Sequence, residues 1–242
     1  MLEDTLCFFD FEASSADAKT AMVIEAATAT FSLDGRMLKS QSTVVQIDSI
    51  GEEITQITGL RKEHCDLGIN FAVLYNFLAE GFGLSRFLVG HNILKYDVKL
   101  VTRLNFGERL LEGRHLIDTM FDIEFPQTST SKKLTHLCSD RGIPTPNAHG
   151  ALYDCIYTSQ LFFSFTKEER DEIYKRAQTP AVYIKACVNY DGRDLAKKHK
   201  FRFDPETKTW WKQVRLYDRE RIKAEVGNEF KIEILDNSFN LS

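Results

Sequence analysis

The chain has few of the residues that form covalent or metal cross-links. It contains five cysteines in 242 residues, and none of them forms a Cys-x2-Cys pair. An odd number of scattered cysteines indicates neither a disulfide framework nor a structural zinc site. We therefore expect a fold held by its own apolar core, in a reducing cytoplasm.

Long apolar runs and a basic amino terminus are also absent. No segment approaches the roughly 20 consecutive apolar residues that a membrane-spanning helix needs. The first residues include Glu3 and Asp4, with no basic region before them. These absences argue against secretion and membrane insertion. With 43% hydrophobic and 27% charged residues, the composition is that of a globular protein of one or two domains.

Two acidic residues end an apolar run near the amino terminus, Phe8-Phe9-Asp10-Phe11-Glu12. If this run is a strand, Asp10 and Glu12 lie on one face, because side chains two apart point to the same side. An acid at a strand end is more often a solvated turn residue, so the pattern alone is weak. Two anions at the edge of an apolar core, however, need a cation.

A second acid lies where a helix is expected to begin. The sequence from Phe87 to Val101 predicts a strand, a loop and a helix, with Asp97 at the start of the helix. Asp97 there is equally compatible with a helix N-cap. At helical spacing, Asp97 falls on the same arc as Leu100 and Leu104. An acid on an apolar stripe indicates a partner inside the fold.

A histidine and a third such acid follow in His149-Gly150-Ala151-Leu152-Tyr153-Asp154. This segment opens a helical pattern, in which Asp154 lies roughly 60° from Ala151 and points toward the sheet. His149 precedes the helix and is expected on the loop formed by residues 144–148. A lone histidine there is more often a surface or capping residue. Beside three inward acids, we interpret His149 as catalytic.

The three motifs, Asp-x-Glu, Asn-x3-Tyr-Asp and His-x4-Asp, in this order resemble the DEDDh (DnaQ-like) 3′–5′ exonucleases. That superfamily includes the proofreading subunit of bacterial replicative DNA polymerase, exonuclease X, RNase T and oligoribonuclease. The resemblance covers residues 4–166 and includes the segments 23–27, 57–60, 117–120 and 133–144. Gly150 stands where the sister DEDDy group has tyrosine.

The resemblance implies a ribonuclease-H-like α/β fold, with a mixed sheet of three antiparallel strands plus parallel strands, flanked by helices. The order of predicted elements agrees with it: strands near 5–11, 22–32 and 37–47 precede alternating helices and strands from 70 to 165. Asp34-Gly35 between the second and third strands is a strong hairpin signal.

The resemblance also implies a mechanism with two divalent ions, Mg²⁺ or Mn²⁺. Asp10, Glu12, Asp97 and Asp154 would be the metal ligands, since Mg²⁺ prefers hard oxygen donors. His149 would be the general base, because imidazole changes protonation near neutral pH. The expected reaction removes 5′-mononucleotides from single-stranded 3′ ends.

Further residues are expected to contact the substrate. In place of the family's frequent Thr-Thr-Gly, this chain has Ala13-Ser14-Ser15, so contacts there would rest on backbone amides and Ser14. A phosphate contact by Lys132 and a solvated helix start are equally compatible with the sequence. The substrate-binding candidates are Phe11, Ala13, Ser14, His91, Asn92, Lys132 and Trp211.

The identity of the substrate is left open by the sequence. DNA is the predicted substrate, and RNA or short oligoribonucleotides are the alternative. Both stay open because no residue in the sequence indicates whether the site accepts or excludes a 2′-hydroxyl. An inactive nucleic-acid-binding relative is a remote alternative, because all five catalytic candidates are present. The sequence identifies no protein partner.

The last part of the chain differs in charge and aromatic content. We expect an exonuclease domain over residues 1–178 and a small basic, aromatic-rich α+β accessory module over 179–242. Residues 182–223 contain 12 Lys and Arg against 6 Asp and Glu, a net charge of +6, whereas the whole chain is at −4. The pattern from Ala196 to Trp210 resembles small modules appended to nucleic-acid enzymes. One of its two tryptophans is expected in the module's core, and the role of the other is left open.

Overall fold

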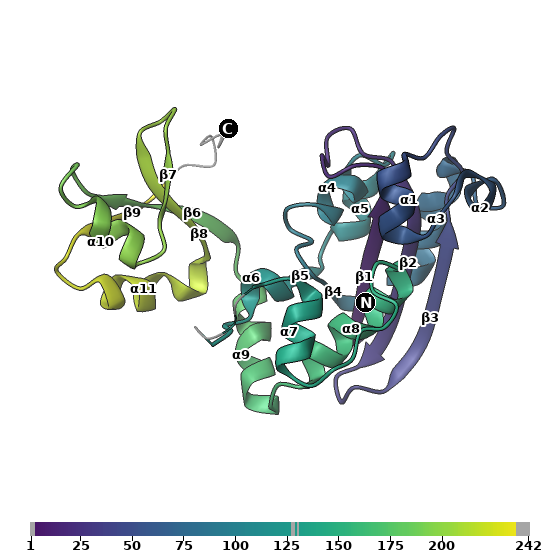
Figure 1. The fold of residues 1–242 in the computed structure, drawn as a ribbon. Helices are drawn as coiled ribbons and strands as arrows, with labels where there is room; N and C mark the ends of the chain where they lie inside the picture. The colour runs from purple at the N-terminus through teal and green to yellow at the C-terminus, as the bar shows by residue number, and fades with distance from the viewer. Residues whose placement is uncertain (1–2, 127–128, 130, 236–242) are drawn as a thin grey trace. The chain divides into compact units, whose positions relative to one another are not determined.

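The computed structural model describes residues 3–126, 129 and 131–235 (Figure 1). The chain divides into two compact units, with the boundary between Ile173 and Tyr174. Within the described residues, no helix is both long and apolar enough to cross a membrane. All five cysteines are free thiols, and only Cys187 among them is exposed.

The first unit is built on one five-stranded mixed sheet, in the order β3-β2-β1-β4-β5. The strands are β1 (Glu3–Ala13), β2 (Val23–Ser32), β3 (Met37–Val44), β4 (Ser85–Gly90) and β5 (His115–Asp118). The first three strands form an antiparallel meander, while β4 runs parallel to β1 and β5 parallel to β4. This arrangement confirms the predicted ribonuclease-H-like fold. The hairpin between β2 and β3 turns at Gly35, whose φ of +92° suits glycine.

Helices flank this sheet in the first unit (Figure 1). They are α1 (Glu52–Thr58), α2 (Lys62–Asp66), η1 (Phe71–Val73), α3 (Leu74–Phe82), α4 (Asp97–Thr102), α5 (Gly107–Leu111), α6 (Thr119–Asp122), α7 (Leu134–Asp140) and α8 (Ala151–Phe163). A further helix, α9 (Lys167–Ala177), runs across the boundary between the two units.

Alternation along β1 divides its side chains between two apolar layers. The ring of Phe8 lies 5.9 Å from that of Phe162 in α8, whereas the ring of Phe9 lies 5.2 Å from that of Phe82 in α3. Residues two apart share a face, so Asp10 and Glu12 lie on the Phe8 side, which α8 covers. The end of β1 thereby directs two carboxylates toward the first turn of α8.

The second unit contains a four-stranded antiparallel sheet in the order β7-β8-β6-β9. Its elements are β6 (Ala181–Cys187), α10 (Arg193–Lys198), β7 (Arg202–Asp204), β8 (Thr209–Arg215), η2 (Leu216–Asp218), α11 (Arg219–Val226) and β9 (Lys231–Ile234). Ala196 of α10 and Ile222 and Val226 of α11 pack with Ile184 and Val214 of the sheet in one apolar core. Both helices therefore cover the same face of the sheet.

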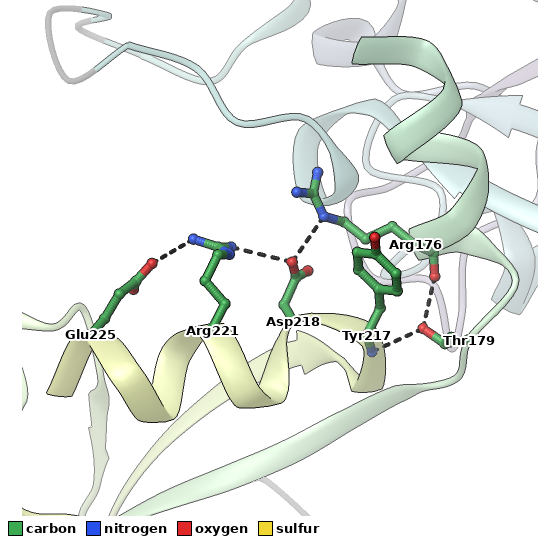
Figure 2. A network of polar contacts seen from close by, with 6 residues as sticks. All are labelled: Arg176, Thr179, Tyr217, Asp218, Arg221 and Glu225. Carbon is green, nitrogen blue, oxygen red and sulfur yellow. Dashed lines mark hydrogen bonds and ion pairs between the residues drawn. The ribbon is translucent and has the colours of Figure 1, made fainter. Parts of the chain in front are cut away.

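A polar network holds the first residues of the second unit to its last helix (Figure 2). The buried carboxylate of Asp218 accepts hydrogen bonds from Arg176 (3.0 Å) and Arg221 (3.3 Å). The hydroxyl of Thr179 donates to the Arg176 carbonyl (2.8 Å) and accepts from the Tyr217 amide (3.2 Å). The end of α9 is thus part of the second unit, although the sequence was expected to divide after residue 178.

Candidate active site

Three of the predicted catalytic side chains converge beside the end of β1. Glu12 comes from β1, Asp154 from the first turn of α8, and His149 from the loop that precedes α8. One ligand atom of each lies within 4.8 Å of the others. Segments far apart in the sequence therefore form a single group of possible metal ligands.

The other two acids belong to the same cluster. Asp97 is the first residue of α4 and is only 4% exposed. Its Oδ1 accepts a hydrogen bond from the Phe11 amide (3.1 Å), which joins α4 to β1. Burial raises the pKa of Asp10 well above its ordinary value, and the charges of Asp97, Asp154 and Glu12 raise it further. The Asp97 side chain therefore points into the fold, as its helical spacing indicated. It does not act as an N-cap, because no side-chain cap hydrogen bond is formed at α4.

Burial and mutual repulsion raise the pKa of the other carboxyl groups as well. The pKa of Glu12 is raised to about 8, mainly by burial and then by the charges of Asp154 and Glu25. Burial raises the pKa of Asp97 to about 7. Burial also raises the pKa of Asp154 to about 6, although the neighbouring His149 lowers it. A cluster of this kind holds protons near neutral pH unless a cation compensates the charges.

One oxygen of the cluster has no hydrogen-bond partner. Asp154 Oδ1 is buried, and no donor reaches it among the described residues. Buried polar atoms almost always have a partner, and carboxylate oxygens are the ligands that Mg²⁺ and Mn²⁺ favour. The donor set and this unsatisfied oxygen therefore fit a divalent cation.

The backbone of His149 adopts a left-handed conformation, with φ of +70°. Histidine is among the few residue types enriched in this region, which costs energy for most side chains. The side chain is exposed, directly before Gly150 and the first turn of α8. The turn thus brings an accessible imidazole next to Glu12 and Asp154.

Glu25 is a member of the site that the sequence motifs did not identify. It lies on β2 directly opposite Glu12, and its Oε2 accepts a hydrogen bond from the Ala151 amide (3.1 Å). This contact ties β2 to the first turn of α8, which carries Asp154. An acid inside the apolar run Val23–Ala27 was the available signal, but its partner depends on the β1–β2 register.

Asp118, at the end of β5, organises the loop that leads to Asp97. Its Oδ1 accepts a hydrogen bond from the Asn92 amide (2.8 Å), and its Oδ2 accepts one from the Leu94 amide (3.1 Å). Asn92 has φ of +65°, so this loop also contains a left-handed residue. The carboxylate of Asp118 therefore holds the loop through main-chain atoms.

Two of the predicted substrate contacts are engaged within the protein. The ring of His91 lies between the Thr119 hydroxyl (2.8 Å from Nδ1) and the Lys132 carbonyl (2.8 Å from Nε2). Burial lowers the pKa of His91 to about 4, so the ring is neutral at pH 7. Lys132 directs its ammonium to the Met120 carbonyl (3.1 Å). These contacts give His91 and Lys132 a role in holding the segment after β5.

The segment after Glu12 is closed by its own hydrogen bonds. Ser14 uses both its amide (2.8 Å) and its hydroxyl (2.9 Å) to bond main-chain atoms of Met22. The Tyr96 hydroxyl donates to the Ser15 carbonyl, and Ser15 Oγ is a second buried atom without a partner among the described residues.

The remaining candidates lie at different places. Ala13 ends β1 beside the acids, and the Phe11 ring packs in the apolar core against Phe9, with ring centroids 5.8 Å apart. Phe11 thus meets the site through its amide, which bonds Asp97. Trp211 belongs to β8 of the second unit, outside the unit that holds the acids.

Comparisons with known proteins agree with this geometry. The RNase T exonuclease family model matches residues 7–162. Similar solved structures include E. coli exonuclease I with a dA16 oligonucleotide (TM-score 0.62, 14% identity, covering 76% of this chain and 48% of that one). Exonuclease I with 5cy-dT13 has a TM-score of 0.61 at 13% identity, covering 77% of this chain and 48% of that one. No curated protein sequence matches this chain.

Another exonuclease I structure covers 93% of this chain and 68% of that one, with a TM-score of 0.65 at 12% identity. This chain spans about half the length of the two oligonucleotide-bound proteins. At such identities the structural likeness shows the shared fold. The family match covers more than half of the sequence and includes every acid of the cluster. The chain therefore belongs to the RNase T exonuclease family, which confirms the resemblance to the DEDDh (DnaQ-like) superfamily.

Proposed function

We propose that this chain is a two-metal-ion exonuclease that removes 5′-mononucleotides from the 3′ ends of single-stranded nucleic acid, with DNA preferred over RNA. The observation that carries the proposal is the cluster of Asp10, Glu12, Asp97 and Asp154, in which one buried carboxylate oxygen has no partner among the described residues. The family match supports the reaction class.

The four acids would hold the two ions, either Mg²⁺ or Mn²⁺. When bound, such ions stabilise negative charge on the attacking and the leaving oxygen of a phosphodiester. The chain contributes a fixed arrangement of carboxylates, because Asp97 is anchored by the Phe11 amide and Asp154 follows the helix turn that Glu25 holds.

His149 would accept a proton from the attacking water. The imidazole nitrogen near the Glu12 and Asp154 carboxylates is the acceptor atom, and both acids lie within 4.8 Å of it. The exposed position of His149 lets a proton pass to solvent after each turnover. A positioned general base typically contributes about 10²- to 10⁴-fold to the rate.

The preference for DNA rests on the similar structures, which contain dA16 and dT13 oligonucleotides. A direct test incubates 5′-labelled single-stranded DNA, duplex DNA, RNA and dinucleotides side by side with Mg²⁺, Mn²⁺ or EDTA. We expect a metal-dependent ladder of shortened single-stranded DNA and 5′-mononucleotide products. A 3′-terminal phosphate should block the reaction, because a 3′ exonuclease needs the free terminal hydroxyl.

An Asp154→Asn protein, purified in the same way, controls for contaminating nucleases. Cleavage of a closed circular single strand would show endonuclease activity and would contradict the proposal. Faster shortening of RNA than of DNA would reassign the substrate to RNA while leaving the reaction intact.

A further inference from the structure

The two adjacent tryptophans of β8 lie on opposite faces of the second sheet. Directly opposite residues of antiparallel strands share a face. Trp210 pairs with Ala186 of β6 and Phe203 of β7, and it packs against the core that both helices cover. Trp211 pairs with Lys185 and Arg202, so it lies on the other face.

Trp211 stands at the centre of a row that crosses all four strands. In the order of the sheet, the row is Arg202 of β7, Trp211 of β8, Lys185 of β6 and Glu233 of β9. A cation therefore flanks the indole on each side. The ring of Tyr183 meets the indole edge to face, with centroids 5.6 Å apart, and forms an aromatic pair with it.

Positive charge predominates around this row. Its accessible cations are Lys185, Lys231 and Arg202, and its acids are Glu233 and Asp204, counted among the described residues of this face. Arg215 lies on the same face but is buried and donates to the Thr179 carbonyl (3.2 Å). Glu233 pairs with both Lys185 and Lys231, at 2.9 Å each, and the buried Asp204 accepts hydrogen bonds from the turn after β7. Arg202 is exposed at the edge strand.

We propose that this face of the second unit, with Trp211 at its centre, binds single-stranded nucleic acid. A base stacks on the Trp211–Tyr183 pair, and Arg202 and Lys185 contact the phosphates on either side. An aromatic ring between cations suits bases joined by phosphates, because each base has a π face and each linkage a negative charge. The site shares its substrate class with the proposed function, but none of its residues belongs to the acid cluster.

The test measures binding of 5′-fluorescein-dT30 by fluorescence anisotropy. Full-length protein is used in EDTA, so that no strand is cut. Trp211→Ala should weaken binding at least about fivefold, and Trp211→Phe should restore most of the loss, because stacking depends on a ring. Arg202→Gln should weaken binding and flatten the logarithmic salt dependence by about 0.7, as expected for one lost phosphate contact.

Matched variants separate this face from the rest of the unit. Lys198→Gln removes an exposed cation from α10, where it pairs with Glu229 on the helix side, and should leave the Kd within about twofold. Trp210→Ala should lower the melting temperature of the unit, because that indole packs against the core. Trp211→Ala should leave the melting temperature nearly unchanged.

Binding by Trp211→Ala and Trp211→Phe equal to that of the wild type would overturn the proposal. If the Trp211 variants bound a poly-glutamate peptide less tightly than the wild type but bound dT30 equally well, the face would be assigned to an acidic protein partner. That result would also overturn the proposal. Hydrolysis of a trinucleotide reports on the acid cluster alone. If the wild type did not hydrolyse the trinucleotide, the proposed function would be contradicted, whereas the binding of dT30 in EDTA would still test the Trp211 site.

Discussion

Removing one titratable carboxyl group from the acid cluster should make the metal-free protein more stable at neutral pH. Glu12 is the informative position, because burial and neighbouring acids raise its pKa from 4.5 to about 8. At pH 7 the folded protein keeps this proton, whereas the unfolded chain releases it. The free energy of unfolding therefore falls as the pH rises from about 4.5 to about 8.

The size of the effect follows from the pKa. A proton that the folded protein holds and the unfolded chain releases lowers the free energy of unfolding. The loss is about 1.4 kcal/mol for each pH unit by which the working pH exceeds the pKa in the unfolded chain. From the Glu12 values of 4.5 and about 8, the cost at pH 7 is about 3 kcal/mol. Glu12→Gln keeps the shape of the side chain without a titratable proton. It should raise the free energy of unfolding by up to about 3 kcal/mol at pH 7 and change it little at pH 4.5.

Urea denaturation in EDTA at both pH values measures this difference. Glu63→Gln, on the exposed surface of α2, is the control and should change stability little at either pH. Adding Mn²⁺ should stabilise the wild type and should stabilise Glu12→Gln much less, because a ligand is lost. The reasoning would be refuted if Glu12→Gln and the wild type had the same free energy of unfolding at pH 7. It would also be refuted if their free energies of unfolding differed equally at pH 4.5 and pH 7.

Four further outcomes are expected. Asp10→Ala should abolish or greatly weaken divalent-metal binding in calorimetry without unfolding the chain, and unchanged binding would remove Asp10 from the cluster. His149→Ala should bind metal and DNA normally but hydrolyse about 10²- to 10⁴-fold more slowly at pH 7.5; near-normal turnover would assign the proton to another acceptor. Glu25→Ala should slow hydrolysis at least about tenfold, because a hydrogen bond to a charged acceptor contributes about 1.5–3 kcal/mol, while Glu25→Gln keeps an acceptor and most of the rate; a full rate in Glu25→Ala would contradict this. A chain ending at Ile173 should still cut trinucleotides, since the five catalytic candidates precede that boundary, and loss of this activity would make the second unit part of the chemistry.

Local patterns predicted individual elements of the first unit, and the family resemblance predicted their arrangement in the sheet. Alternation around Phe8 and Asp10 predicted the strand and the shared face, and Asp34-Gly35 predicted the hairpin, because these features depend on neighbours in sequence. The inward direction of Asp97 followed from helical spacing. The catalytic roles of these residues stay predictions.

Contacts between distant segments were beyond the sequence. Glu25 joins the site because β2 pairs with β1 in one register and because α8 docks there, 126 residues later. The ring of His91 is enclosed by Thr119 and Lys132, which no local pattern indicates. Likewise, a charged helix containing Arg176 gives no sign of an ion pair with Asp218.

The paired tryptophans of β8 also bear on how the second sheet finds its register during folding. A slip of β8 by one residue would exchange its two faces, as in any strand. Here a slipped strand would still place an indole against the helices, because Trp211 would take the position of Trp210. The difference comes at the other end, where Arg215 would replace the buried Val214. For a slip in this direction, Val214, and not either tryptophan, is therefore the residue of β8 that discriminates against the misaligned sheet.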